Sequence, residues 1–140
     1  MELRGSTEYI VIHCSATKPS MDIGLREIRD WHVKDNGWRD VGYHFIIRRN
    51  GEVELGRNIK DTAAHAAGYN HKSIGIAMVG GMAEDDSTEN NFTDKQWMAL
   101  LDLVKTQLTN YPDAKIIGHN EISKKDCPAF NVQQWKEDNL

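Results

Sequence analysis

The sequence has few cysteines, no long apolar run and no excess of positive charge. Its two cysteines, Cys14 and Cys127, would suit a disulfide in an exported protein. In a reducing compartment a metal-binding or catalytic role is expected for at least one of them. No stretch approaches the roughly 18 apolar residues that a membrane span requires, and the N-terminus MELRGSTEY lacks the basic then apolar profile of a secretory signal. We therefore expect a protein that folds in the cytosol and does not enter a membrane.

The charge balance also limits the partners. With 17 Lys and Arg against 21 Asp and Glu, the formal net charge is −4, which argues against a protein that grips a phosphate backbone. Nucleic acid is therefore not an expected partner. A length of 140 residues with 39% hydrophobic and 27% charged residues is typical of one globular domain with its own core, here residues 1–140. We expect a monomer, because no apolar stripe is left over once the core is assigned.

Apolar runs and helical periodicities alternate along the chain. Strands are expected at 8–14, 43–48, 52–56, 73–81 and 115–118, and helices from Asp22 to Asn36-Gly37, from the Thr93 and Gln96 capping box to Tyr111, and from Asn131 through Trp135. Asn50-Gly51 predicts a tight antiparallel hairpin, because both residues tolerate positive φ. The fold class is therefore α/β, a single domain with a mixed sheet of about five strands flanked by helices.

A loop near the C-terminus, GHNEISKKDCPAF, brings an imidazole, a cation and a thiol together as His119, Lys125 and Cys127. His13 closes the first strand, and it could complete a set of two imidazoles and one thiolate, which is an accepted ligand set for catalytic zinc. The spacing alone is a weak signal. The alternative is that His13 is a hydrogen-bonded histidine at a strand end and that Cys127 is a small buried hydrophobe.

Neighbouring residues offer competing interpretations. Adjacent strand residues point to opposite faces, so if His13 is a ligand, Cys14 belongs to the core. Tyr43 could hydrogen-bond a water or a substrate oxygen, or it could simply pack at a strand start. Lys125 could stabilise an oxyanion, or it could be solvated surface like Lys124. His65 lies in the loop 60–73, where it would line a cleft or simply be exposed.

Several motifs, in this order, make the chain similar to a known family. They are HCSATKPS, REIRDWH, GWRDVGYHFIIRRNGEVELGR, AHAAGYNHKSIGIAMVGG, FTDKQWMALLDLV and GHNEISKKDCPAF. Together they closely resemble the zinc-dependent N-acetylmuramoyl-L-alanine amidases, above all the T7-type phage lysozymes, which share their domain with the peptidoglycan-recognition proteins. The likeness covers roughly residues 8–136. It is more specific than the ligand spacing.

The resemblance implies one Zn²⁺ ion held by His13, His119 and Cys127, with Tyr43 and Lys125 as catalytic residues. It implies hydrolysis of the amide between N-acetylmuramic acid and L-alanine in peptidoglycan, and a mixed sheet with zinc at the floor of a groove. His65 and Asn70 are our predicted substrate contacts.

The same likeness predicts a phage endolysin without a separate cell-wall-binding domain. It would be made in the host cytoplasm and would reach the periplasmic wall after a separate holin permeabilises the membrane. Some phage members use the segment before Tyr9 to inhibit the phage RNA polymerase, which makes that enzyme a second candidate partner.

Two rival functions stay open at this point. The first is a cysteine peptidase with Cys127 or Cys14 as the nucleophile and a histidine as the base. The second is a module that binds peptidoglycan or a polymerase without catalysis.

Overall fold

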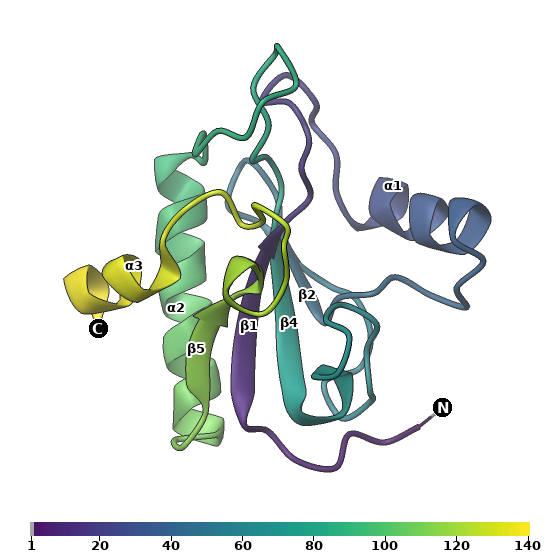
Figure 1. The fold of residues 1–140 in the computed structure, drawn as a ribbon, viewed down its shortest axis with the longest axis vertical. Coiled ribbons are helices and arrows are strands. Elements are labelled where there is room, and N and C mark those ends of the chain that lie inside the picture. The colour runs from purple at the N-terminus through teal and green to yellow at the C-terminus, as the bar shows by residue number, and fades with distance from the viewer. Residues whose placement is uncertain (1) are drawn as a thin grey trace.

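A five-stranded mixed sheet forms the centre of the computed structural model, which describes residues 2–140 (Figure 1). The strands are β1 (Tyr9–Cys14), β2 (Phe45–Ile47), β3 (Val53–Leu55), β4 (Ser73–Met78) and β5 (Lys115–Gly118), in the spatial order β3-β2-β4-β1-β5. β1 is parallel to both β4 and β5, and β2 is parallel to β4, whereas β3 pairs antiparallel with β2. The predicted fold class is confirmed.

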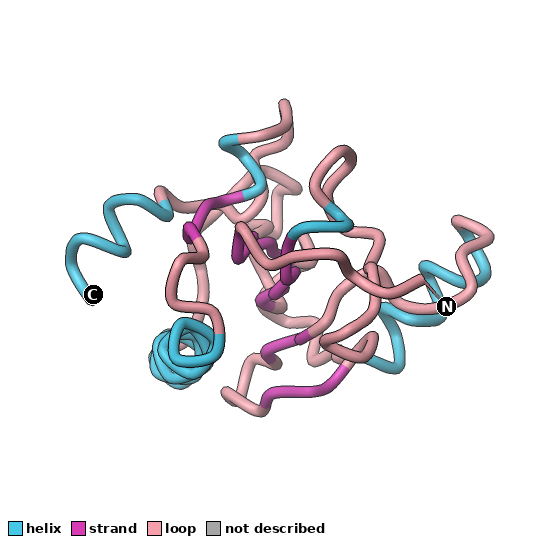
Figure 2. Tube along the Cα trace, turned by 90° about the horizontal axis from the view of Figure 1, so that it is seen from below, coloured by secondary structure: helices cyan, strands magenta, loops and turns pink. Residues whose placement is uncertain are grey.

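Helices cover both faces of this sheet. They are α1 (Leu25–Asp30), which continues as the π-helical turn η1 (Trp31–Asp35), then η2 (Asn70–Lys72), α2 (Asp94–Asn110), η3 (His119–Glu121) and α3 (Val132–Asn139). Figure 2 looks nearly along α2 and places the strands between α2 and α1. No helix within residues 2–140 is both long enough and apolar enough to cross a membrane.

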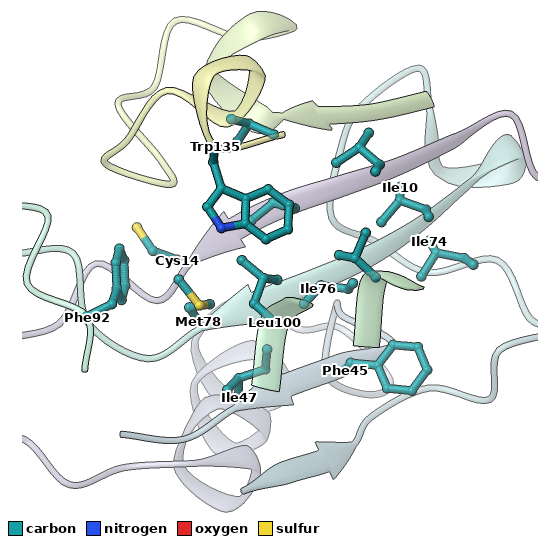
Figure 3. Packing of buried hydrophobic residues seen from close by; sticks show 14 of the residues in the cluster. Ile10, Cys14, Phe45, Ile47, Ile74, Ile76, Met78, Phe92, Leu100 and Trp135 are labelled. Carbon is teal, nitrogen blue, oxygen red and sulfur yellow. The ribbon is translucent and has the colours of Figure 1, made fainter. Parts of the chain in front are cut away.

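The alternation of side chains along β1 separates the main core from the face that bears the chemistry. Ile10, Ile12 and Cys14 belong to the core cluster beneath α2, which Figure 3 shows with Leu100 of that helix. Val11 and His13 alternate with them and therefore point to the opposite face of the sheet. Cys14 is accordingly a core residue, as the sequence analysis predicts for the case in which His13 is a ligand.

The helices α2 and α1 begin in different ways. The capping box of α2 is as predicted: the N–H of Gln96 donates to Thr93 Oγ1 at 3.1 Å, and the N–H of Thr93 donates to Gln96 Oε1 at 3.0 Å. The first helix is expected from Asp22, but α1 begins after Gly24, so Asp22 does not cap it. The first free N–H of α1, on Leu25, instead donates to Glu54 Oε1 of β3 at 2.8 Å, so a residue distant in sequence caps this helix.

The hairpin is antiparallel as predicted, but its turn and length differ. Only Gly51 takes a positive φ, of 88°. The N–H of Arg48 donates to the carbonyl of Glu52 at 2.8 Å, which leaves a three-residue loop rather than a two-residue turn at Asn50-Gly51. The ladder covers only β2 and β3, so the ends of the predicted runs 43–48 and 52–56 lie outside it.

Two other predicted boundaries shift. The strand predicted at 73–81 ends at Met78, and the closing helix continues beyond Trp135 to Asn139. The loop 60–73, in which His65 is expected to line a cleft or to be exposed, buries Ala63, His65 and Ala66.

Candidate metal centre

Three side chains that could bind a metal converge at the carboxyl ends of the parallel strands. His13 lies at the end of β1, His119 begins η3 directly after β5, and Cys127 follows in the loop before α3, a segment that crosses over the end of β1 in Figure 1. One ligand atom from each residue lies within 4.8 Å of the others. The fold thus brings together the three residues that the sequence analysis selects as ligands.

Cys127 is fixed by the backbone of the first strand. The N–H of Cys14 donates to Cys127 Sγ at 3.0 Å. A hydrogen bond to the Cys14 side chain and burial both raise the pKa of the Cys127 thiol. A metal ion would bind this sulfur as the thiolate, so binding would release the proton of the thiol.

The two histidines favour their neutral forms. Burial is the main cause that lowers the pKa of His13, and His65, His119 and Lys125 lower it further. Burial and the charge of Lys125 lower the pKa of His119. A neutral imidazole is the form that binds a metal, so both rings favour the protonation state that a ligand requires.

The ligand set and its spacing fit zinc. Tetrahedral zinc with bonds of about 2.0 Å to nitrogen and about 2.3 Å to sulfur places its ligand atoms roughly 3.3 to 3.7 Å apart, which the 4.8 Å limit accommodates. Two imidazoles and one thiolate leave a fourth tetrahedral position for a water or a substrate atom. This arrangement is typical of catalytic rather than structural zinc.

A cleft of about 390 Å³ opens beside the three residues. Its walls include Trp38, His65, Asn70, His119, Ser123 and Lys125. One potential ligand, the catalytic candidate Lys125 and both predicted substrate contacts therefore line a single hollow.

Tyr43 and Lys125 differ in their environments. The ring of Tyr43 lies 5.1 Å from the ring of His13, and burial together with Cys127 and Cys14 raises the pKa of its hydroxyl above the usual value. Tyr43 therefore stays protonated and can donate a hydrogen bond. Lys125 is exposed, yet its charge reaches the site. It contributes to the lowered pKa of His13 and of His119, and it opposes the rise in the pKa of Cys127.

The structure gives His65 partners that the sequence did not indicate. The His65 side chain is 8% exposed, its Nδ1 lies 2.8 Å from His13 Nε2, and its Nε2 lies 3.0 Å from Ser73 Oγ. Burial, followed by the nearby histidines and arginines, lowers the pKa of His65 to about 3. Asn70 holds the loop in place, since its Oδ1 accepts hydrogen bonds from the N–H groups of His65 and Ala66, both at 2.9 Å.

Ser73 is the participant that the sequence analysis missed. Its pattern is that of a residue at the start of a buried strand, and no local signal connects it with a histidine eight residues earlier.

Comparison with known sequences gives one consistent result. The sequence profile of the N-acetylmuramoyl-L-alanine amidase family matches residues 3–130. The endolysin of Escherichia phage T7 is 49% identical over 136 residues, which cover 97% of this chain and 89% of that protein.

Solved structures agree. The endolysin N-acetylmuramoyl-L-alanine amidase LysCS of Clostridium intestinale superposes with a TM-score of 0.83 at 26% identity, over 98% of this chain and 86% of the other. The peptidoglycan-recognition protein PGRP-SA of Apis mellifera superposes with a TM-score of 0.81 over 97% of this chain and 86% of the other. Its 24% identity supports a shared fold only.

Proposed function

The chain belongs to the N-acetylmuramoyl-L-alanine amidase family, and we propose that it is a zinc-dependent member that cleaves the amide between N-acetylmuramic acid and L-alanine in peptidoglycan. The observation that supports zinc dependence is the convergence of His13, His119 and Cys127 within 4.8 Å. When bound there, zinc supplies Lewis-acid activation of a water molecule and of the scissile carbonyl.

The residues around the three ligands supply hydrogen bonding and charge. Tyr43 keeps its proton and donates a hydrogen bond to the oxygen on which negative charge develops during attack on the carbonyl. Lys125 adds positive charge at the mouth of the cleft, where it opposes the same developing charge. One donor aimed at such an oxygen contributes about 2.7 to 4 kcal/mol in other hydrolases.

The cleft beside the ligands receives the stem peptide and sugar. We retain His65 and Asn70 as contacts in its wall. Both ring nitrogens of His65 already have protein partners, so its contribution to the substrate is through the ring surface. Asn70 uses its Oδ1 within the loop, which leaves its amide N–H groups for a substrate oxygen.

The phage endolysins among the relatives suggest the biological role. We propose that the enzyme acts in host-cell lysis: it is made in the host cytoplasm and reaches the periplasmic wall once the membrane has been permeabilised. The monomeric state and a role in binding the phage RNA polymerase rest on the sequence analysis alone, and no step of the mechanism depends on them.

Digestion of purified peptidoglycan tests the proposal. The protein should release stem peptides, lose this activity in a strong chelator and regain it with added zinc. Cys127→Ala should abolish zinc binding and activity together. Lys124→Ala is the control, because Lys124 is an exposed residue of the same loop as Cys127.

Each rival function gives a different result. A cysteine peptidase keeps its activity in the chelator, and a binding module releases no stem peptide. Full lytic activity in a zinc-free Cys127→Ala protein would refute the mechanism.

A further inference from the structure

A chain of hydrogen bonds leads from a backbone carbonyl to the proposed ligand His13. It runs from the carbonyl of Tyr69 through Ser73 Oγ and the ring of His65 to His13 Nε2, with successive distances of 2.7, 3.0 and 2.8 Å. Ser73 is fully buried, His13 is 1% exposed and His65 is 8% exposed, so solvent has little access to the chain. The order of donors and acceptors along this chain determines which ring nitrogen of His13 carries no proton and can bind a metal.

The hydrogen bond between Ser73 and the Tyr69 carbonyl determines which groups donate along the rest of the chain. A carbonyl oxygen can only accept, so Ser73 must use its single hydroxyl proton on Tyr69. Ser73 Oγ can then only accept in its second contact, and His65 Nε2 must carry the proton that joins them. A buried polar pair without a donated proton would cost free energy, which makes the opposite direction unfavourable.

The position of the His65 proton determines the tautomer of His13. Neutral His65 has one ring proton, and because this proton is on Nε2, its Nδ1 is an acceptor. The 2.8 Å contact with His13 Nε2 therefore requires that His13 Nε2 donates. Neutral His13 then has no proton on Nδ1, and the lone pair of Nδ1 is available to a metal ion.

We propose that His65 and Ser73 are positioning residues that hold His13 in the tautomer and orientation in which its Nδ1 binds the metal. This inference rests on the proposed zinc site. Partners of this kind orient ligand rings in many metal sites, where they are usually a carboxylate, a backbone carbonyl or water. Here a second histidine takes that place, and a serine fixes its proton.

Two further features place the His65 ring where the chain needs it. Gly75 of β4 leaves space for the ring, because a Cβ on Gly75 would lie 2.6 Å from His65 Cγ and 2.8 Å from its Nδ1. Asn70 fixes the backbone of His65 from the other side. The ring is thus held between a strand and an ordered loop.

Nitrogen-15 NMR of the histidine rings in the zinc-loaded wild-type protein tests the inference without any substitution. His13 should show a proton on Nε2 and metal coordination through Nδ1, and His65 should show its proton on Nε2. Coordination of zinc through His13 Nε2 would overturn the inference.

Two substitutions of His65 separate its two hydrogen bonds. The Asn side chain places its oxygen near the position of Nδ1, so His65→Asn keeps the acceptor for His13, whereas His65→Gln reaches only the position of Nε2. In competition with a chromophoric chelator, we expect His65→Gln to bind zinc about 10- to 100-fold more weakly and His65→Asn to bind close to the wild-type level. His71→Asn is the matched control, because His71 is an exposed histidine of the same loop.

Ser73→Ala provides a second, independent variant. It frees His65 to adopt either tautomer, so we expect weaker zinc binding and a mixture of His13 tautomers in the NMR spectrum. Wild-type affinity in His65→Gln and Ser73→Ala, with both proteins folded by circular dichroism, would overturn the inference while leaving the proposed function intact. Failure of the wild-type protein itself to bind zinc would overturn the proposed zinc site as well.

Discussion

Acid should destabilise this protein through His44, a buried histidine just before β2. Its side chain is 1% exposed. His44 Nδ1 accepts a hydrogen bond from the Gly75 N–H at 3.0 Å, and His44 Nε2 donates to the carbonyl of Asp61 at 2.8 Å. A protonated ring has no acceptor for the Gly75 N–H. Burial is the largest cause that lowers the pKa of His44 to about 4.

The sign and size of the effect follow from this pKa. The unfolded chain binds the His44 proton near the ordinary pKa of 6.5, whereas the folded protein binds it only near 4. Neutral His44 therefore contributes its full stability above pH 6.5, and this contribution is lost as the pH falls from 6.5 through 4. The folded and unfolded pKa values of His44 differ by about 2.5 units, and at about 1.36 kcal/mol per unit this corresponds to about 3 kcal/mol in the free energy of unfolding.

His44→Asn isolates this contribution. An Asn oxygen keeps an acceptor near the Gly75 N–H but does not titrate, and the bond to Asp61 is lost, at a cost of about 1 to 2 kcal/mol at pH 7. Between pH 7 and pH 4 the wild type should lose about 3 kcal/mol more free energy of unfolding than the variant, which does not titrate at this position. At pH 4 the variant should therefore be as stable as the wild type or more stable.

Urea unfolding between pH 7 and pH 4, in chelator so that metal release does not contribute, measures this gap. His71→Asn should follow the wild-type curve. Parallel pH profiles for wild type and His44→Asn would show that His44 does not contribute to the acid sensitivity of the fold.

Three further predictions concern catalysis and one helix. Tyr43→Phe should lower kcat about 100- to 1000-fold with zinc affinity unchanged, as measured by peptide release and chelator competition. Lys125→Met should lower kcat, and Lys125→Arg should retain most of it, because charge rather than a specific donor is required; equal activity of both variants with wild type would contradict this role. Thr93→Ala removes one side of the capping box with Gln96 and should cost about 1 kcal/mol of stability, whereas the exposed Thr106→Ala, tested in the same urea titration, should cost little.

The sequence predicts those elements that are encoded by local pattern. β1, β4 and β5 are short apolar runs with polar boundaries, and α2 has both its helical period and its capping box in the sequence. The start of α1 could not be predicted in the same way. Its first N–H is satisfied by Glu54 from another element, so no local cap is needed, and Asp22 resembles a cap without acting as one.

The candidate metal site is predictable for a different reason. Parallel strands place their carboxyl ends at one edge of a sheet, so His13 after β1 and His119 after β5 are brought together by topology. Spacing joins Cys127 to them only weakly, and the family resemblance makes the assignment specific, because the Cys127 loop is held by a bond from the Cys14 N–H that no periodicity encodes. The same bond shows why Cys14 matters here through its backbone, while its side chain packs in the core.

Gly75 shows most clearly what a single sequence conceals. In SIGIAM it looks like a small residue in an apolar strand, yet its N–H donates to His44 and its missing side chain leaves space for the ring of His65. Two buried histidines, one important for acid stability and one joined to the proposed ligand His13, therefore depend on one strand position. Their contacts span 31 residues to His44 and 10 to His65 in sequence, and only the completed sheet brings them together. The two buried histidines thus meet at one strand glycine beside the candidate metal site.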